Sequence, residues 1–265
     1  MNDIQIGIIG GTRGMGGWLA RFLEKEGYIV HISGRNRGID LDEMAPTCQV
    51  VVVSVPIGVT RAVIEKVGPF MRADSLLMDL TSLKEEPVKA MLETSASEVI
   101  GCHPLFGPQI DSIAGQRVVL CPVRTEKWIS WLQAILEKNG AIVMETTPEI
   151  HDRMMAIVQG LNHFNTIVMG LVLSKAGVSF SELCRFATPA FQAKIEIIQK
   201  VFCQNPTLYA EIVTMNPDIH QLIEAYEKKV AELKNLIYQG NSIDIADMIE
   251  KHAAFFKPTL GAVTE

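Results

Sequence analysis

Two short stretches of the sequence carry side chains suited to acid–base chemistry. GCHPLFGP (residues 101–108) ends a predicted strand and places His103 in a loop bounded by proline and glycine. A histidine there could act as a general base, because its ordinary pKa lies close to neutral pH. MDLTSLKEEP (78–87) ends another predicted strand and supplies Ser82 and Lys84. These residues indicate a dehydrogenase that removes a hydroxyl proton while hydride leaves; a purely structural histidine is the alternative.

A third stretch, IGIIGGTRGMGG, is close to the G-x-G-x-x-G turn that binds dinucleotides. Gly11 and Gly16 hold the outer places of this pattern, and Arg13 replaces the middle glycine. Glycines let the backbone approach a pyrophosphate, and the following helix offers free N–H groups at its start. We therefore predict a phosphate site rather than a tight turn without a ligand. Its expected residues are Gly10, Gly11, Thr12, Arg13, Gly14, Met15 and Gly16, with Pro56 at the end of the third strand.

The end of the second predicted strand indicates which dinucleotide binds. NAD sites usually carry an acidic residue there, which binds the ribose 2′-hydroxyl. This chain reads HISGRNRG instead, with Ser33, Arg35 and Arg37. Hydroxyl and guanidinium groups can bind a 2′-phosphate, and Arg13 could add a third donor. We predict NADP in preference to NAD, with NAD use still open; arginines that only solvate a loop are the alternative.

The elements that position these residues follow from the hydrophobic pattern. Short β-rich runs alternate with helical segments in the first half, which is typical of a parallel sheet covered on both faces. The expected strands are residues 4–10, 28–33, 50–56, 75–80, 97–104 and 116–122. After residues 140–149 the pattern changes to long helices, and Thr147–Pro148 and Thr188–Pro189 are good helix starts. The sequence predicts an α/β, Rossmann-like, mostly parallel domain at 1–150 for the dinucleotide and an all-helical substrate and dimerisation domain at 151–265.

Composition and charge narrow the class of protein. The 265 residues carry a formal net charge of −6, which argues against general binding to nucleic acid or to an anionic membrane. Five scattered cysteines form no C-x-x-C pair and are interpreted as reduced thiols in a cytoplasmic protein. We expect no apolar run near the roughly 20 residues that span a bilayer. Histidines and carboxylates lack the spacing of metal ligands on one face, so no metal site is predicted.

Together, three motifs in this order resemble the prephenate dehydrogenase family, which includes arogenate dehydrogenase. They are MDLTSLKEEP, GCHPLFGP and PEIHDRMMAIVQGLNHF (148–164), and the later FATPAFQAKIEIIQKVFCQNPTLYAEI (186–212) is also similar to the family. The resemblance implies oxidative decarboxylation of prephenate to 4-hydroxyphenylpyruvate in tyrosine biosynthesis. It implies that His103 accepts a hydrogen bond from the substrate hydroxyl, that Ser82 lies near this pair and that Lys84 lies beside nicotinamide and substrate.

The same resemblance assigns roles in the second domain. It places His163 near the active site and makes His151 structural; a satisfied core residue is an equal alternative for His163. A family arginine that binds the ring carboxylate corresponds here to Lys200, and Gln192 stands where many relatives have another basic or polar residue. Lysine supplies a cation but not the planar fork of arginine. An ordinary exposed ion pair between Glu196 and Lys200 is the other interpretation.

Several functions remain open from the sequence. Arogenate dehydrogenase runs the same chemistry on a substrate with an amino-acid side chain. Another NADP-dependent reductase and a catalytically silent NADP-binding regulator are less favoured, because His103, Ser82 and Lys84 are all present. The apolar helices beyond residue 150 predict a homodimer through the helical domain.

Overall fold

The valine- and isoleucine-rich runs form one eight-stranded sheet in the order β3-β2-β1-β4-β5-β6-β7-β8. The computed structural model describes residues 3–35 and 37–257; the backbone of Arg37 is included, but its side chain is not. The strands are β1 (Gln5–Ile9), β2 (Ile29–Gly34), β3 (Arg37–Gly38), β4 (Val50–Val53), β5 (Leu76–Asp79), β6 (Glu98–Pro104), β7 (Arg117–Arg124) and β8 (Ile142–Glu145). The six predicted strands are confirmed to within a few residues.

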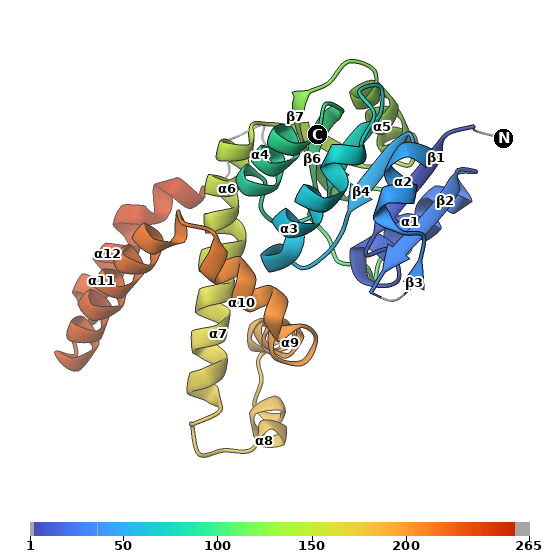
Figure 1. Ribbon diagram of the computed structural model, residues 1–265. Coiled ribbons are helices and arrows are strands. Elements are labelled where there is room, and N and C mark those ends of the chain that lie inside the picture. Colours follow the sequence, from blue (N-terminus) through green and yellow to red (C-terminus); the bar gives the residue numbers. More distant parts are fainter. Residues whose placement is uncertain (1–2, 36, 258–265) are drawn as a thin grey trace. The chain divides into compact units, whose positions relative to one another are not determined.

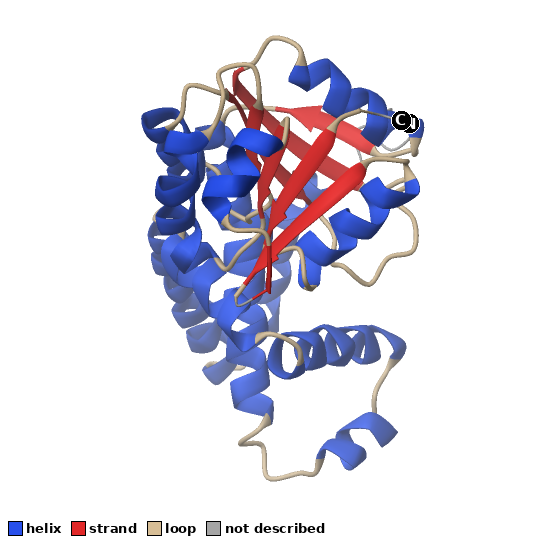
Figure 2. Ribbon diagram, turned by 45° about the vertical axis from the view of Figure 1, so that its right-hand side comes forward, coloured by secondary structure: helices blue, strands red, loops and turns tan. Residues whose placement is uncertain are grey.

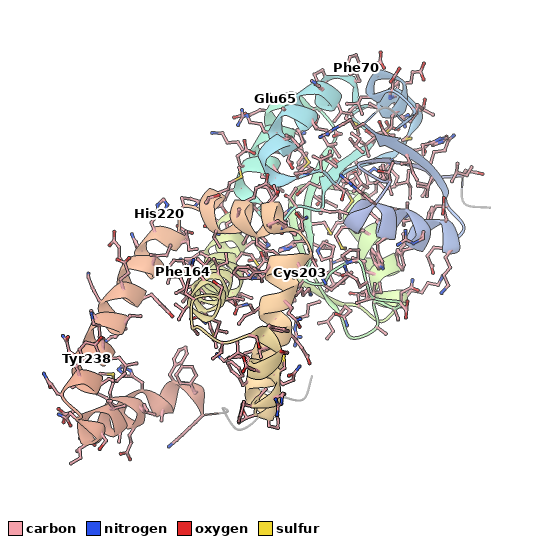
Figure 3. All side chains as sticks on the ribbon, turned by 90° about the horizontal axis from the view of Figure 1, so that it is seen from below. Glu65, Phe70, Phe164, Cys203, His220 and Tyr238 are labelled. Carbon is pink, nitrogen blue, oxygen red and sulfur yellow. The ribbon has the colours of Figure 1, made fainter. Side chains whose placement is uncertain are left out.

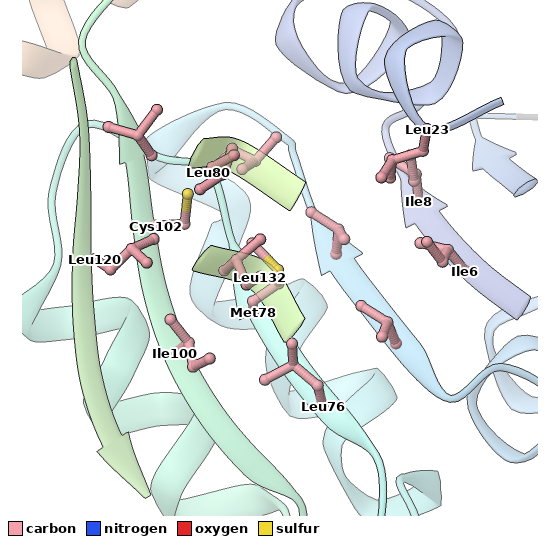
Figure 4. Close-up of a cluster of buried hydrophobic side chains, with 14 of the residues drawn as sticks. Ile6, Ile8, Leu23, Leu76, Met78, Leu80, Ile100, Cys102, Leu120 and Leu132 are labelled. Carbon is pink, nitrogen blue, oxygen red and sulfur yellow. The ribbon is translucent and has the colours of Figure 1, made fainter. Parts of the chain in front are cut away.

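Helices on both faces bury the sheet (Figure 2). They are α1 (Gly14–Lys25), α2 (Leu41–Thr47), α3 (Ile57–Val67), α4 (Glu85–Thr94) and α5 (Trp128–Lys138), with a 3-10 turn η1 (Gly68–Phe70). Successive strand residues point to opposite faces, so Ile6 and Ile8 join one core and Ile9 the other. The first core, packed under α1 and α5, includes Met78, Ile100 and other side chains drawn in Figure 4. The second lies under α2, α3 and α4.

The parallel pairing brings five strand ends to one edge. β2, β1, β4, β5 and β6 are successive parallel neighbours, so their carboxyl ends all lie on the same side. The glycine turn follows β1, Pro56 follows β4, the 79–84 loop follows β5, and His103 lies near the end of β6. Ligands of open α/β sheets bind at this edge. The fold therefore collects the predicted cofactor and catalytic residues at one place.

After β8 the chain is helical (Figure 1). The segments are α6 (Pro148–Met155), a π-helical stretch η2 (Ala156–Leu161), α7 (Asn162–Leu173), α8 (Phe180–Arg185), α9 (Pro189–Cys203), α10 (Pro206–Met215), α11 (Ile219–Tyr238) and α12 (Ser242–Phe256). α7 and α9 pack together; Phe164 and Cys203 on them are labelled in Figure 3. By its internal contacts the chain forms two compact units that divide after Ile219. The domain boundary near residue 150 stays a prediction.

Both predicted helix starts are confirmed. The Thr147 hydroxyl accepts from the backbone N–H of Ile150 at 3.3 Å, and the Thr188 hydroxyl accepts from that of Phe191 at 3.3 Å. In each case proline occupies the following position, where its missing N–H costs nothing.

The first of these starts opens a long helix. α6, η2 and α7 form a continuous helix, Pro148–Leu173, which by length and composition alone could cross a membrane. In the described residues it is the single helix that meets this test, and 22% of its most apolar window is buried. His151 and Asp152 in its first turns are buried against the α/β part, so this end of the helix lies in the protein interior.

The sequence did not predict every element. β3 pairs antiparallel with β2, and Gly38 has φ +92°, where other residues are strained. β7 runs antiparallel to β6, and β8 adds a strand at the edge of the sheet. The short helices α2, α8 and α10 were also not expected. β3, β8 and these helices are too short for hydrophobic periodicity to reveal them, and the direction of β7 depends on its pairing with β6.

Candidate active site

The site is built around a buried row of three side chains. His103 of β6 is 3% exposed, and its Nδ1 lies 2.9 Å from Nε2 of His151 on α6. Nδ1 of His151 lies 2.6 Å from Oδ1 of Asp152. The family resemblance predicted a structural role for His151, and no role was predicted for Asp152. The reason is that His103, which His151 contacts, is 48 residues away in the chain. The structure joins the predicted base to a carboxylate through a second imidazole.

Asp152 also ties the helical part to the start of α4 (Figure 1). Its two carboxylate oxygens accept the backbone N–H groups of Lys84 at 2.8 Å and of Glu85 at 2.9 Å. A carboxylate at a helix N-terminus is stabilised by unpaired N–H groups and by the helix dipole. The side chain of Asn216 donates to the backbone carbonyl of Asp152 at 2.7 Å. Asp152 is thereby held from both sides.

Lys84 lies in the interior, beside the strand that carries His103. Its side chain is fully buried and forms an ion pair with Asp79, whose Oδ2 also accepts from the backbone of Thr81 at 2.9 Å. The Lys84 ammonium donates to the carbonyl of Cys102 at 3.0 Å, directly before His103. These contacts position the end of β6. The placement of Lys84 beside nicotinamide and substrate stays a prediction.

The remaining catalytic candidate, Ser82, is half-buried in the loop between β5 and α4. This loop begins at the end of β5, next to the strand that carries His103. Among the residues that the structure describes, no hydrogen bond joins Ser82 to His103. The placement of Ser82 near the substrate hydroxyl stays a prediction.

The open nitrogen of His103 faces a partly polar wall from the long helix. Gln159, in the π-helical stretch η2, has its amide nitrogen 3.4 Å from Nε2 of His103. Within the described chain, Oε1 of Gln159 and Nδ1 of His163 are buried without a hydrogen-bond partner. The ring of His163 packs edge-on against Tyr209 of α10, with centroids 4.9 Å apart. Buried polar atoms without partners are rare and suggest a missing ligand or solvent.

Burial sets the protonation of these groups. It lowers the pKa of His103 well below the ordinary 6.5, and His151 and the Lys84 ammonium act in the same direction. Burial likewise lowers the pKa of His163, aided by the positive charge of Lys200, and raises the pKa of Tyr209. The imidazoles of His103 and His163 are therefore neutral at physiological pH. A neutral His103 can accept a proton.

Lys200 on α9 is exposed, and its charge acts on His163. The alternative of an ordinary ion pair is not realised, because no Lys200–Glu196 pair forms among the described residues. The amide of Gln192 donates to Glu196 at 3.2 Å. Lys200 thus stays available to an anion, whereas Gln192 is engaged on an exposed face of the helix.

The glycine turn fits a phosphate group. Gly10 has φ +85°, and a side chain there would collide with the carbonyl of Ser54. A Cβ on Gly16 would lie 2.6 Å from the carbonyl oxygen of Gly10. Gly14 has φ +60°, and a Cβ on it would meet nothing within 4 Å. The N-cap residue Arg13 makes no side-chain cap, so the first N–H groups of α1 are open to an anion.

The cationic loop after β2 lies next to this turn. The N–H of Gly10 donates to the carbonyl of Ser33 at 2.7 Å, and a Cβ on Gly34 would contact the Thr12 side chain. Arg13 and Arg35 are exposed, whereas Ser33 is buried and therefore less accessible than expected. The predicted contribution of the Arg37 side chain lies outside the described residues. Of the predicted turn residues, Thr12 and Gly14 are exposed, Gly11 is buried and Met15 is half-buried.

On the other side of the turn, Pro56 is exposed and precedes α3. The Glu211 carboxylate of α10 accepts the N–H groups of Ile57 at 3.1 Å and of Gly58 at 3.4 Å. Ile57, Leu83 and Ile212 form a small apolar cluster beside it. α10 is thereby anchored where the sheet edge and the helical part meet.

The residues that the sequence analysis missed share one feature. Asp79, Asp152, Tyr209, Glu211 and Asn216 each act through a partner on another element, and for most of them this partner is distant in the chain. For these five residues, the one feature of the sequence that could have indicated a role was the position of Asp79 at the end of a buried strand. In the described residues, no group of three or more His, Cys, Asp or Glu side chains is placed to hold a metal ion.

The fold and the site define a class: a dinucleotide-binding α/β protein whose helical part completes a histidine-centred site. The chain belongs to the prephenate dehydrogenase family. Residues 34–145 match the family model described as "Prephenate dehydrogenase, nucleotide-binding domain". Residues 147–251 match the model described as "Prephenate dehydrogenase, dimerization domain".

Similar proteins carry related names. The chain is 37% identical over 273 residues to a "Probable arogenate/prephenate dehydrogenase" of Methanocaldococcus jannaschii, covering 96% of this chain and 61% of that protein. It is 35% identical to the "T-protein" of Haemophilus influenzae, covering 89% and 64%. The chain thus spans less than two thirds of the length of these curated relatives.

Solved structures share the fold. A prephenate dehydrogenase from A. aeolicus in complex with hydroxyphenyl propionate and NAD+ has a TM-score of 0.74 at 20% identity, covering 96% of this chain and 97% of that one. The arogenate dehydrogenase of Synechocystis has a TM-score of 0.70 at 20% identity, covering 95% and 98%. At these sequence identities the similarity shows a shared fold.

The buried pair between Asp79 and Lys84 generates a stability prediction. Lys84→Met leaves a buried carboxylate without its cation and should lower the free energy of unfolding by about 3–5 kcal/mol. Lys84→Met combined with Asp79→Asn removes both charges and should recover a large part of that loss. Urea denaturation of both variants measures the difference.

Lys89→Met, on an exposed lysine of α4, is the matched control and should change the free energy of unfolding by less than about 0.5 kcal/mol. A double variant no more stable than Lys84→Met would contradict the ion-pair explanation.

Proposed function

We propose that this chain catalyses the NADP-preferring oxidative decarboxylation of prephenate to 4-hydroxyphenylpyruvate, a step of tyrosine biosynthesis. The carrying observation is His103, a buried base at the same sheet edge as the dinucleotide turn, with Nδ1 paired to His151 and Nε2 directed to the wall that holds unpartnered polar atoms. Membership of the prephenate dehydrogenase family supports the substrate class.

In this proposal the chain mainly orients groups and handles one proton. The bound oxidised nicotinamide would accept hydride from the ring carbon that bears the hydroxyl. His103 Nε2 takes the hydroxyl proton as that carbon becomes a carbonyl. Loss of CO₂ from the opposite ring carbon then makes the ring aromatic, and the phenolate oxygen takes the proton back. Gln159 and His163 line the substrate side, and burial of His103 excludes water from the transfer.

The first experiment is turnover of purified protein with prephenate or arogenate, each with NADP⁺ or NAD⁺, followed at 340 nm. We expect turnover with prephenate and NADP⁺, and we expect His103→Asn to lower kcat by about 10²- to 10⁴-fold because the proton acceptor is lost.

Two outcomes would change the proposal. Turnover of arogenate alone would keep the chemistry and replace the substrate, in line with the name of the Methanocaldococcus jannaschii relative. Absence of turnover with either substrate, in protein that binds NADP⁺, would reject the enzymatic function in favour of another reductase or a silent NADP-binding regulator.

Two cations at separate places support the choice of ligands. Arg35 is exposed after β2, where an NAD site would carry a carboxylate, so it suits a 2′-phosphate. Lys200 is exposed near His163 and suits the ring carboxylate of the substrate. Its single ammonium replaces the planar fork of arginine, which lowers the number of directed hydrogen bonds but keeps the charge.

These cations form a matched pair of variants. Arg35→Ala should raise the KM for NADP⁺ by about ten- to a hundredfold and leave the KM values for NAD⁺ and prephenate unchanged. Lys200→Met should raise the KM for prephenate by about the same factor and leave the KM values for both cofactors unchanged. Each variant serves as the control for the other. A rise of both KM values in both variants would indicate general damage to the site and refute the separate roles.

We further infer a homodimer formed by the helical part. Leu171 and Val172 on α7 are 54% and 64% exposed, although the helix that carries them is apolar enough to pass for a membrane span. The matching family model for this region is described as a dimerization domain. A second copy of the chain would remove this apolar surface from water. A cytoplasmic location stays a prediction, supported by five cysteines that are all free.

The dimer can be tested by sedimentation equilibrium. The protein should have twice the chain mass of 29.2 kDa, and Leu171→Glu should shift it towards the monomer because a charge would be buried in the interface. Phe70→Glu, on a side chain 49% exposed in the nucleotide-binding part, is the control and should leave the dimer intact. A monomeric wild-type protein at micromolar concentration would refute the proposal.

A further inference from the structure

We infer that His151 and Asp152 form a proton-storing relay behind His103, so that the hydroxyl proton taken up during the proposed reaction is held inside the protein and returned to the same substrate. The inference rests on the proposed function and deepens it. In this inference His151 and Asp152 do not contact the substrate. They orient His103 and stabilise the positive charge that follows proton uptake.

With both imidazoles neutral, the contacts allow one consistent set of protons along the row. A carboxylate only accepts, so Asp152 requires the hydrogen of His151 to lie on Nδ1. Nε2 of the neutral His151 is then an acceptor, and His103 must donate to it from Nδ1. Nε2 of His103 is left as an acceptor, and the amide nitrogen of Gln159, which only donates, faces it at 3.4 Å. The resting row is therefore ready to receive a proton at one atom, Nε2 of His103.

The far end of the row is closed. His103, His151 and Asp152 are 3%, 2% and 5% exposed. The carboxylate of Asp152 is occupied by the backbone N–H groups of Lys84 and Glu85, which are donors and cannot carry a proton away. The row thus has an entrance at His103 and no exit to solvent at Asp152. A row that retains the proton suits a reaction in which the same proton must later return to the product oxygen.

Surrounding charges favour movement of the proton away from His103. The Lys84 ammonium, paired with Asp79 and next to the thiols of Cys102 and Cys121, lies on the His103 side and disfavours a cation there. On the other side, the carboxylates that act on one another around the start of α4 are Asp152, Glu85, Glu149 and Asp218. The Asp152 carboxylate, hydrogen-bonded to Nδ1 of His151, therefore attracts positive charge towards its end of the row.

The step balances. The substrate hydroxyl gives its proton to Nε2 of His103, and Nδ1 of His103 gives its proton to Nε2 of His151. His103 ends neutral in its other tautomer, and His151 becomes an imidazolium hydrogen-bonded to the Asp152 carboxylate. A bound oxidised nicotinamide would supply the acceptor for the two electrons, which leave the substrate carbon as hydride. After CO₂ departs, both protons move back and the phenol forms.

The tautomers can be measured without substrate or cofactor. In ¹⁵N-histidine-labelled protein, the signals of the six histidines are assigned with His103→Asn and His151→Gln. Long-range ¹H–¹⁵N spectra should show His103 and His151 each protonated at Nδ1 and bare at Nε2, with a strongly downfield Nδ1 proton on His151. A proton on Nε2 of His103 at neutral pH would overturn the relay even if the enzyme is active. If no substrate turns over while this pattern holds, the proposed function fails and the hydrogen-bonded row remains.

Kinetics then separate a relay from a merely structural carboxylate. Asp152→Asn should lower kcat by about ten- to a hundredfold with little change in the KM for substrate. Because the carboxylate stabilises the cationic row, its loss should also move the acid limb of the kcat/KM profile to lower pH. The wild-type limb itself should lie below 6.5, since burial lowers the pKa of His103.

Glu86→Gln is the matched control. This carboxylate also lies in the first turn of α4 but pairs with Arg61 on the surface at 3.0 Å, so kcat and the pH profile should not change. A fall in kcat with an unmoved acid limb in Asp152→Asn would assign Asp152 a structural role only. If Asp152→Asn does not fold, His151→Gln gives the same kcat test and the tautomer measurement on the wild type decides.

Discussion

The Asp152 carboxylate is the interaction on which the site depends. It accepts two backbone N–H groups at the start of α4 and one imidazole from its own helix, so a single side chain joins the β5–α4 loop, α6 and, through His151, the end of β6. A carboxylate can do this because it has two oxygens with several lone pairs and suits the positive end of a helix. Without it, the two imidazoles would have no fixed tautomer.

The same logic, in which a buried polar group is satisfied by several elements, recurs around the site. Asp79 and Lys84 hold the strand end before His103, and Glu211 holds α10 on the first turn of α3. Such groups are costly to bury alone, and their hydrogen bonds offset much of this cost, although Oδ1 of Asp79 has no partner among the described residues. On the substrate side, Gln159 and His163 keep buried polar atoms without a partner in the described chain. These atoms lie on or next to a π-helical stretch, a distortion often found at functional sites.

Replacement of a glycine by Arg13 leaves the dinucleotide turn geometrically intact. The close contacts that exclude a side chain fall at Gly10 and Gly16, where backbone meets backbone, whereas position 13 is exposed at the start of α1. A cation there adds to the positive end of the helix dipole. The turn therefore tolerates a charged side chain at this place, and with Arg35 it forms a cationic side of the proposed cofactor site.

The sequence by itself determined the alternating strands and helices, the caps at Thr147 and Thr188, and the place of His103 at a strand end, because hydrophobic periodicity and capping are local properties of the chain. It also carried the family motifs. The tertiary structure alone decided that Lys84 is buried against Asp79, that His151 and Asp152 stand behind His103, and that Tyr209 packs on His163. The motif MDLTSLKEEP shows which residue types are present but not which way they face. That depends on the pairing of β5 with β6 and on the docking of α6 against α4, contacts between residues that are distant in sequence and therefore invisible to any local pattern.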